Sequence, residues 1–369
     1  MIPNNKAIRI LYDSMLVGIL TTTNREVAVF EYDQDWLTNG FSISPFELPL
    51  ESGFINAKEN PFYGLFGVFN DSLPDGWGQL LVDRWLRQQG INPTGISWLD
   101  RLSIVGNHGM GALRYEPAVS YASQMPVQSL DFYANEVTKI VQEVEVESLD
   151  YWIERAGSPG GARPKILYDA DGIEWLVKFP AESDPKDIGK LEYEYSLAAK
   201  QAGIIMPETR LFENKYFGSA RFDRKNGKRL HMLTISGLLN ASHRYPSLDY
   251  TDIMKAVLWV TESMVEVEKV FRQMVFNVLC HNQDDHAKNF SLLYESDKWI
   301  YSPAYDLVYS TGFRGNHSTT ILNEGNPNKS QMIEAGVHAG LKVGLCEQIY
   351  LEVEEATSEL VAYVNKRFR

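Results

Sequence analysis

The residues best suited to chemistry lie in two neighbouring segments of the C-terminal half. The first is HNQDDHAKNFSLLY, residues 281–294, and the second is YSPAYDLVYS, residues 301–310. Four side chains with hard oxygen atoms stand in them beside strand-like sequence: Asp284, Asp285, Asn289 and Asp306. Such oxygens suit Mg²⁺ held partly by substrate phosphates, because this ion keeps several waters and accepts few protein ligands.

The spacing of these side chains matches the parts used for phosphoryl transfer by kinases. Asn289 follows Asp284 by five residues, and Asp306 lies beyond a short hairpin. In that chemistry one carboxylate orients the attacking hydroxyl, while the Asn and the second Asp hold metal. The alternative is a solvated loop whose Asp and Asn side chains only cap turns. The segment alone does not decide between the two.

A glycine-rich segment, AGSPGGARPK at residues 156–165, precedes the strand-like KILY. Gly157, Gly160 and Gly161 would let backbone N–H groups approach an anion without interference from a Cβ atom. The segment is neither a Walker A sequence nor a GxGxxG fingerprint. Taken alone, it is more typical of an ordinary turn.

A lysine within an apolar strand is the next candidate. Lys178 in WLVKFP stands thirteen residues beyond Lys165. Its burial would cost desolvation energy unless an anion or a carboxylate paired with it, which favours a phosphate contact. The alternative is an edge strand with Lys178 directed to water. A carboxylate partner could be Glu192 or Glu194, and helical periodicity does not choose between them.

The surrounding sequence predicts a mixture of strands and helices. Alternating segments predict a small antiparallel sheet: residues 7–13, 16–22 and 26–33. Apolar spacing and end signals predict helices near residues 76–89, 97–106, 130–144, 190–203, 263–282 and in the last 40 residues. Two further pairs of strands are expected at 165–179 and at 290–302. Four tryptophans in helical patterns are expected in the core: Trp85, Trp98, Trp152 and Trp259.

Charge and cysteine content narrow the class of protein. Lys and Arg number 35 against 48 Asp and Glu, a formal charge of −13, which is the wrong sign for neutralising many nucleic-acid phosphates unaided. Cys280 and Cys346 are too few for a disulfide framework or a Cys-rich zinc site. His281 and His286 miss the i, i+4 spacing of a helical zinc pair. With no apolar run near eighteen residues and no signal-peptide pattern, we expect a cytoplasmic protein without membrane contact.

Several motifs together resemble the HipA-type serine/threonine kinases, the toxins of bacterial toxin–antitoxin modules. In order and spacing these are SPGGARPK, LVKFP, ARFDR, DDHAKNFSLLY and SPAYDLVYS, while LVGIL, SLPDGWG and GMGALRYEP resemble the family's N-terminal part. The resemblance covers nearly the whole chain, and DDHAKNFS joined to PAYDL is its most specific element. It implies an α+β, bilobal protein-kinase-like fold with an additional small N-terminal β-rich subdomain. The implied divisions are an N-terminal subdomain (1–128), a kinase N-lobe with glycine-rich loop and hinge (129–240) and a helical C-lobe (241–369).

The resemblance also implies a role for each matching residue. Asp284 would be the catalytic base, Asn289 and Asp306 would bind Mg²⁺, and Glu192 is the better match for the helix partner of Lys178. The implied ATP-binding residues are Gly160, Gly161, Ala162, Arg163, Pro164, Lys165, Lys178, Glu192, Ala220, Arg221, Phe222, His286 and Lys288. The family usually has a glutamate where this chain has Ala220, so a side-chain contact from this position to adenine or ribose is not expected.

Ser158 aligns with the loop serine that such kinases autophosphorylate to inactivate themselves. A phosphoserine adds about −1.5 to −2 charges and would compete with the ATP phosphates for the same N–H groups. We therefore expect phosphorylation of Ser158 to disable ATP binding. The alternative is that Ser158 only starts a turn, since Ser before Pro often does.

The resemblance further implies a function and partners. The expected activity is transfer of the ATP γ-phosphate to a protein substrate, such as an aminoacyl-tRNA synthetase, which would arrest translation and growth. The expected binding partner is a helix-turn-helix, HipB-like antitoxin, with DNA contacted only through it. Two alternatives are an antitoxin-dependent corepressor with little kinase activity and a kinase of small molecules. The intact set of Asp284, Asn289, Asp306 and Lys178 favours an enzyme over a corepressor.

Overall fold

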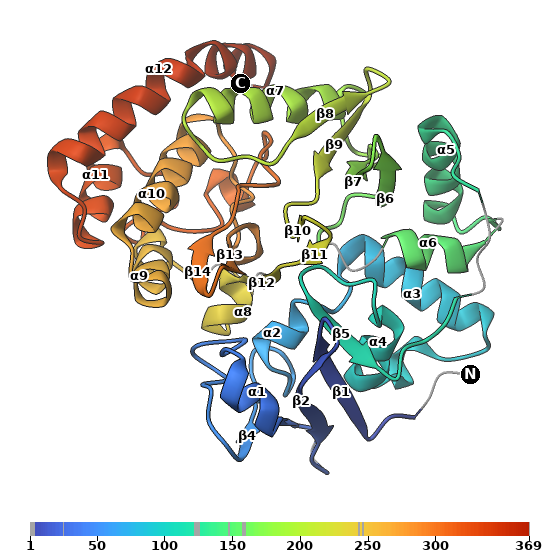
Figure 1. Ribbon diagram of the computed structural model, residues 1–369. Coiled ribbons are helices and arrows are strands. Elements are labelled where there is room, and N and C mark those ends of the chain that lie inside the picture. The colour runs from blue at the N-terminus through green and yellow to red at the C-terminus, as the bar shows by residue number, and fades with distance from the viewer. Residues whose placement is uncertain are drawn as a thin grey trace. The chain divides into compact units, whose positions relative to one another are not determined.

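The computed structural model describes most of the chain in two compact units (Figure 1). The described residues are 4–24, 26–121, 126–146, 148–156, 160–242, 244–245 and 247–368. Unit 1 comprises Met1–Lys186 and Leu211–Leu233, and unit 2 comprises Asp187–Arg210 and Thr234–Arg369. The division at residues 128 and 240 implied by the resemblance stays a prediction.

Unit 1 begins with a five-stranded antiparallel sheet in the order β4-β3-β2-β1-β5. Its strands are β1 (Ala7–Tyr12), β2 (Met15–Thr22), β3 (Ala28–Tyr32), β4 (Phe54–Asn56) and β5 (Leu113–Glu116). Ile8, Leu20 and Phe30 pair across the first three strands and are all buried, as expected for one apolar face of alternating strands. The predicted antiparallel sheet is confirmed.

Most helices of unit 1 stand between strands of this sheet along the chain, and the last two lead to the next sheet. They are α1 (Gln34–Asn39), α2 (Gly67–Asn70), α3 (Gly76–Gln88), η1 (Pro93–Gly95), α4 (Trp98–Val105), α5 (Leu130–Val141) and α6 (Leu149–Ala156). The predicted helices α3, α4 and α5 are confirmed. Helix α6 was indicated only by the helical pattern around Trp152 and its range was not among the predicted ones, because its eight residues are fewer than periodicity usually needs.

The second sheet of unit 1 has the order β6-β7-β9-β8, and the chain returns to unit 1 within β8. Its strands, and the short ones that follow, are β6 (Lys165–Ala170), β7 (Ile173–Lys178), β8 (Thr209–Phe212), β9 (Tyr216–Ala220), β10 (Arg224–Lys225), β11 (Lys228–Arg229) and β12 (His231–Thr234). Asp171 and Gly172 turn the β6–β7 hairpin with positive φ angles of 54° and 75°. This is the two-residue turn that favours Asp-Gly, and it confirms the predicted pair of strands.

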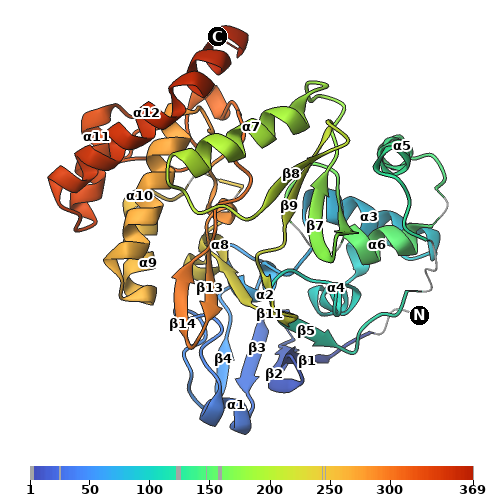
Figure 2. The ribbon, with the colours of Figure 1, turned by 45° about the horizontal axis from the view of Figure 1, so that its top comes forward.

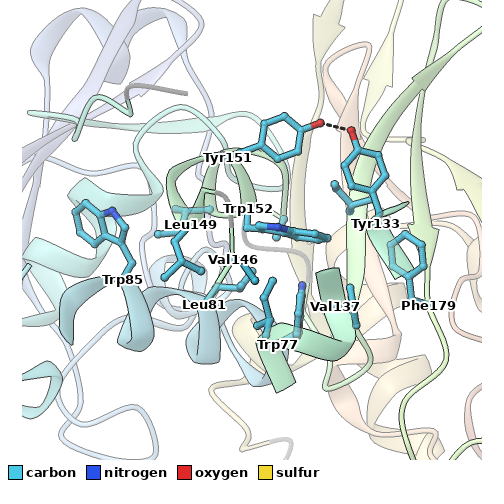
Figure 3. Packing of buried hydrophobic residues seen from close by; sticks show 14 of the residues in the cluster. Trp77, Leu81, Trp85, Tyr133, Val137, Val146, Leu149, Tyr151, Trp152 and Phe179 are labelled. Carbon is cyan, nitrogen blue, oxygen red and sulfur yellow. Dashed lines mark hydrogen bonds between the residues drawn. The ribbon is translucent and has the colours of Figure 1, made fainter. Parts of the chain in front are cut away.

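An aromatic cluster joins α3, α5 and α6 to this second sheet (Figure 3). Trp77 of α3 meets Trp152 of α6 edge to face, with ring centroids 6.1 Å apart. Tyr133 and Tyr151 stack at 5.9 Å and share a hydrogen bond between their hydroxyls. Such pairs stabilise beyond the area that they bury. The start of α3 is therefore packed, through this cluster, against the second sheet of unit 1.

Unit 2 consists mainly of helices around a β-hairpin. Its elements are α7 (Ile188–Gln201), α8 (Ile235–Leu239), α9 (Tyr250–Thr261), α10 (Met264–Leu279), η2 (Ala287–Asn289), β13 (Ser291–Glu295), β14 (Lys298–Tyr301), η3 (Phe313–Gly315), α11 (Lys329–His338) and α12 (Val343–Phe368). The long helix α12 runs along α7 and α10 (Figure 2). The predicted helices and hairpin of this region are confirmed.

The tryptophan expectation holds only in part. Trp85 and Trp152 are buried, but Trp98 is only partly buried and Trp259 is 61% exposed on α9. The expectation for Trp259 is wrong because helical spacing alone does not say which side of a helix another element covers. Among the described residues, no helix is long and apolar enough to cross a membrane.

Candidate functional site

Two adjacent aspartates of unit 2 have opposite environments. The Asp284 side chain is 66% exposed, whereas that of Asp285 is fully buried. The Asp285 carboxylate accepts hydrogen bonds from the Tyr250 hydroxyl at 2.7 Å and from the N–H groups of Ser318 and Thr319, and it pairs with His317 Nδ1 at 2.8 Å. Asp285 thus has a structural role, because its hydrogen bonds join Tyr250 to residues 317–319. Of the two carboxylates, that of Asp284 is the one that a substrate can reach.

A chain of buried polar groups fixes the backbone of Asp284. Asn277 on α10 donates to the Tyr250 hydroxyl at 2.9 Å, and Asn282 donates to Asn277 Oδ1 at 3.0 Å. Ser310 donates to Asn282 Oδ1 and accepts from the Asp284 N–H at 2.9 Å. Burial, and then the Asp285 carboxylate, raise the pKa of Tyr250 well above its usual range, so this hydroxyl remains a donor.

Asn289 is hydrogen-bonded to the start of the same loop. It ends the single turn η2, is 8% exposed, and donates from Nδ2 to the Asp284 carbonyl at 2.6 Å. Because the amide nitrogen makes this bond, the amide oxygen is the atom oriented for another partner. An oxygen held in this way suits a hard cation.

Tyr305 brings the segment of Asp306 to the same loop. Its hydroxyl donates to the Lys288 carbonyl at 2.6 Å and lies 2.5 Å from Ser291 Oγ, on either side of Asn289. Asp306 itself has φ of 57°, a left-handed conformation that is rare outside glycine and is found at functional sites. The residue before Asp306 therefore contacts the chain just before Asn289, at Lys288, and two residues after it, at Ser291.

Unit 2 thus gathers Asp284, His286, Lys288, Asn289 and Asp306, five of the residues expected to act on phosphate or metal. His286 Nε2 lies 4.0 Å from Asp284 Oδ1. Within the part of the chain that the structure describes, no three His, Cys, Asp or Glu side chains form a metal cluster. The Asn289 oxygen is of the type that Mg²⁺ accepts, because this ion commonly takes one or two protein oxygens and fills its other positions with phosphates and water.

Unit 1 places two lysines side by side. Lys165 of β6 is paired directly with Lys178 of β7, and the two are 2% and 9% exposed. Directly opposed residues of an antiparallel pair have side chains on the same face, where two like charges repel. The Lys178 ammonium also lies 5.8 Å from the ring centre of Phe217. This face of the hairpin concentrates positive charge and suits an anionic ligand.

The described part of the glycine-rich segment runs into β6. Arg163 makes a two-point contact with Asp184, at 3.1 and 3.2 Å, and the Pro164 carbonyl accepts from the Phe179 N–H at 2.8 Å. The Lys165 ammonium donates to the Gly160 carbonyl. Residues Gly160 to Lys165 are thereby tied to the second sheet, and Ser158 lies outside the described residues.

The expected hinge residues lie at the end of β9. Ala220 pairs with Trp175, and the Arg221 N–H donates to the Glu174 carbonyl at 2.9 Å. The Arg221 guanidinium is buried and pairs with both Glu174 and Asp223. Although burial acts in the opposite direction, Arg221 lowers the pKa of Asp223. The side chain and the N–H of Arg221 are therefore occupied within the protein, and contact with adenine would fall to its neighbours Ala220 and Phe222.

The two glutamates left open by periodicity differ in burial. Glu192 on α7 is 2% exposed, whereas Glu194 is exposed and lines a groove between α7 and α12 with a volume near 1090 Å³. Lys178 belongs to unit 1 and both glutamates to unit 2. Burial makes Glu192 the member of the pair that requires a partner inside the protein.

Sequence reasoning missed three residues that shape these sites. Tyr305 and Ser310 hold the Asp306 segment and the Asp284 N–H, and Asp75 contacts the glycine-rich segment through the Gly161 N–H at 2.6 Å. Tyr305 and Ser310 stand within the YSPAYDLVYS motif, so their position next to Asp306 was an available signal. No local pattern links Asp75 to a residue 86 positions away.

Comparison with known proteins places the whole arrangement in a family. The model of the HipA-like C-terminal domain matches residues 157–361, and that of the HipA N-terminal domain matches residues 8–116. The chain belongs to the HipA family. The first match covers the glycine-rich segment, Lys178, the loop from Asp284 to Asn289, and Asp306.

Relatives of this HipA-family chain carry kinase names. A Sinorhizobium fredii protein named "Putative kinase Y4dM" is 26% identical over 214 residues, 53% of this chain and 52% of that protein. A Haemophilus influenzae protein named "Putative kinase" is 25% identical over 192 residues, 45% of this chain and 56% of that protein. The match therefore spans about half the length of these curated relatives.

A solved structure shows the same fold over nearly the whole chain. The Shewanella oneidensis toxin–antitoxin complex of HipA, HipB and operator DNA contains a chain that aligns with a TM-score of 0.73 at 19% identity. The alignment covers 98% of this chain and 91% of that one. The predicted α+β, kinase-like fold of the HipA type is confirmed.

Proposed function

We propose that this HipA-family chain is an ATP-dependent protein kinase that transfers the γ-phosphate to a serine or threonine hydroxyl. The observation that carries the proposal is the loop of unit 2 in which Asn289 donates to the Asp284 carbonyl at 2.6 Å while the Asp284 carboxylate stays exposed. This loop offers a reachable base and an oriented amide oxygen within five residues. The kinase names of the relatives agree with it.

In the proposed reaction Asp284 orients the substrate hydroxyl and accepts its proton. The hydroxyl oxygen forms a bond to the γ-phosphorus, the bond from that phosphorus to the β–γ bridging oxygen breaks, and ADP leaves. Asn289 and Asp306 would hold Mg²⁺, which neutralises charge on the phosphates. Lys165 and Lys178, which are paired on neighbouring strands of unit 1, would bind the phosphates through their two positive charges.

The proposal extends to the substrate and the partners. The Shewanella structure holds a HipA, a HipB and operator DNA, so we infer a helix-turn-helix, HipB-like antitoxin as the partner here. The net charge of −13 supports contact with DNA through that partner only. For the substrate we propose a translational enzyme such as an aminoacyl-tRNA synthetase, and for Ser158 an autophosphorylation that inactivates the kinase.

Incubation of the purified protein with γ-labelled ATP and magnesium tests the activity. We expect label on the protein itself, mapped by mass spectrometry to Ser158, and on a small set of proteins in a cell extract. The Ser158→Ala variant should lose the label on itself but not the label on other proteins. Absence of transfer to any protein would contradict the proposal, and transfer only to a small molecule would redirect it to that class of substrate.

A further inference from the structure

The start of α3 is tied to the glycine-rich segment within unit 1. The Asp75 carboxylate accepts a hydrogen bond from the Gly161 N–H at 2.6 Å, and the Trp77 N–H donates to the Gly161 carbonyl at 3.2 Å. The Trp77 indole also donates to the Lys165 carbonyl at 3.1 Å. Three hydrogen bonds therefore join two segments that are far apart in sequence.

A glycine at the start of α3 allows this approach. Gly76 has φ of 43°, and a Cβ atom there would lie 2.6 Å from the Gly161 carbonyl oxygen and 2.7 Å from Ala162 Cα. At Gly160 a Cβ atom would make only an ordinary contact with the Asp75 carboxylate, at 3.4 Å. The contact is a close fit of backbone to backbone, which a side chain at Gly76 would prevent.

Asp75 stands at a position where a carboxylate normally caps its own helix. It is the N-cap residue of α3, yet within the described part of the chain its side chain makes no hydrogen bond to the first turn of that helix. The carboxylate is directed to Gly161 instead. A negatively charged group thus occupies a backbone donor of the very segment that would bind an anion.

We infer that Asp75 competes with the phosphates of ATP for the glycine-rich segment and lowers its affinity for the nucleotide. This inference rests on the proposed function and adds a regulatory contact to the same site. A carboxylate and a phosphate cannot both accept from one N–H, and they repel each other at close range. In the same conformation the Lys165 ammonium donates to the Gly160 carbonyl. Binding of ATP therefore requires that Asp75 release Gly161.

The Asp75→Asn variant isolates this effect. The amide oxygen can still accept from the Gly161 N–H, so the contact keeps its shape, while the negative charge is lost. We expect ATP to bind about tenfold more tightly than to the wild type. Adenosine, which has no phosphates, should bind both proteins equally. The matched control is Asp35→Asn, the same charge change at an exposed position of α1 in the same unit.

Titration calorimetry at low and high salt measures these affinities. Because the effect is electrostatic, the ratio between variant and wild type should shrink at high salt, which a purely structural role would not produce. Equal ATP affinity for wild type and Asp75→Asn, or weaker binding by the variant, would overturn the inference while ATP binding by the wild type leaves the proposed function intact. If neither protein binds ATP, the proposed function falls and the inference with it.

Discussion

The ring of Phe368 stacks on the ring of Tyr309, with centroids 4.2 Å apart and planes inclined by 9°. Phe368 ends α12, and Tyr309 follows Asp306 by three residues. The neighbouring Arg367 makes a two-point contact with Asp187 just before α7, and this contact lowers the pKa of Asp187. The end of α12 therefore touches the segment of the proposed metal ligand and the start of the helix that bears Glu192.

The first prediction concerns the energy of this stack. Tyr309→Leu and Phe368→Leu should each destabilise the protein, and the double variant should show a coupling of about 1 kcal/mol between the two rings. Urea denaturation of the four proteins measures it. Phe313→Leu is the control, because that ring is 78% exposed and its removal should cost less than about 0.5 kcal/mol. Strictly additive single changes would show that the stack contributes nothing.

The second prediction concerns the base. Asp284→Asn should reduce phosphate transfer by at least about 100-fold, because the amide cannot accept the hydroxyl proton. Stability and ATP binding should change little, since the side chain is exposed. The control is Asp297→Asn in the β13–β14 turn, a position with φ of 59° that asparagine adopts easily. Transfer at the wild-type rate in Asp284→Asn would remove Asp284 from the mechanism.

The third prediction separates Asp285 from its neighbour. Asp285→Ala removes a buried carboxylate that serves four partners, so we expect a loss of about 3 kcal/mol in the free energy of unfolding. Asp284→Ala should stay within about 0.5 kcal/mol of the wild type. Chemical denaturation followed by circular dichroism compares them. A similar loss in both variants would mean that burial does not distinguish the two residues.

Much of the candidate site could be predicted because its residues are close in sequence. The six residues from Asp284 to Asn289 form one loop, and the hairpin β6–β7 pairs Lys165 with Lys178 across a two-residue turn. In both cases the spacing and a short turn fix which residues meet. Strand alternation likewise fixed the buried face of the N-terminal sheet.

The remainder depends on contacts that a local pattern does not contain. Periodicity left Glu192 and Glu194 equivalent, and only the packing of α7 separates a buried from an exposed carboxylate. The contact of Asp75 with Gly161 joins positions 86 residues apart, and the sequence showed only a helix start at Asp75. The expectation for Trp259 fails for the same reason, since helical spacing did not show that its side chain is 61% exposed on α9.

The fourth prediction concerns acid stability. His231 is fully buried in unit 1, with Nε2 2.8 Å from the Ile43 carbonyl oxygen, and burial lowers its pKa to about 4. The neutral ring is kept in the folded protein, whereas the unfolded chain takes up a proton near its ordinary pKa of about 6.5. Between these two pKa values the unfolded state binds more protons than the folded state. The contribution of neutral His231 to the free energy of unfolding is therefore fully present above pH 6.5 and is lost as the pH falls toward 4.

We expect His231 to account for a loss of about 2 to 3 kcal/mol between pH 7 and pH 4.5. His231→Gln keeps a hydrogen-bond donor but replaces the buried ring, so the variant should be less stable than the wild type at pH 7. Because glutamine does not titrate, the variant should lose less stability on acidification. His338→Gln is the control, because that ring is 53% exposed. Denaturant titrations at both pH values give the four free energies for each pair. An identical pH dependence for wild type and His231→Gln would contradict a neutral, buried His231.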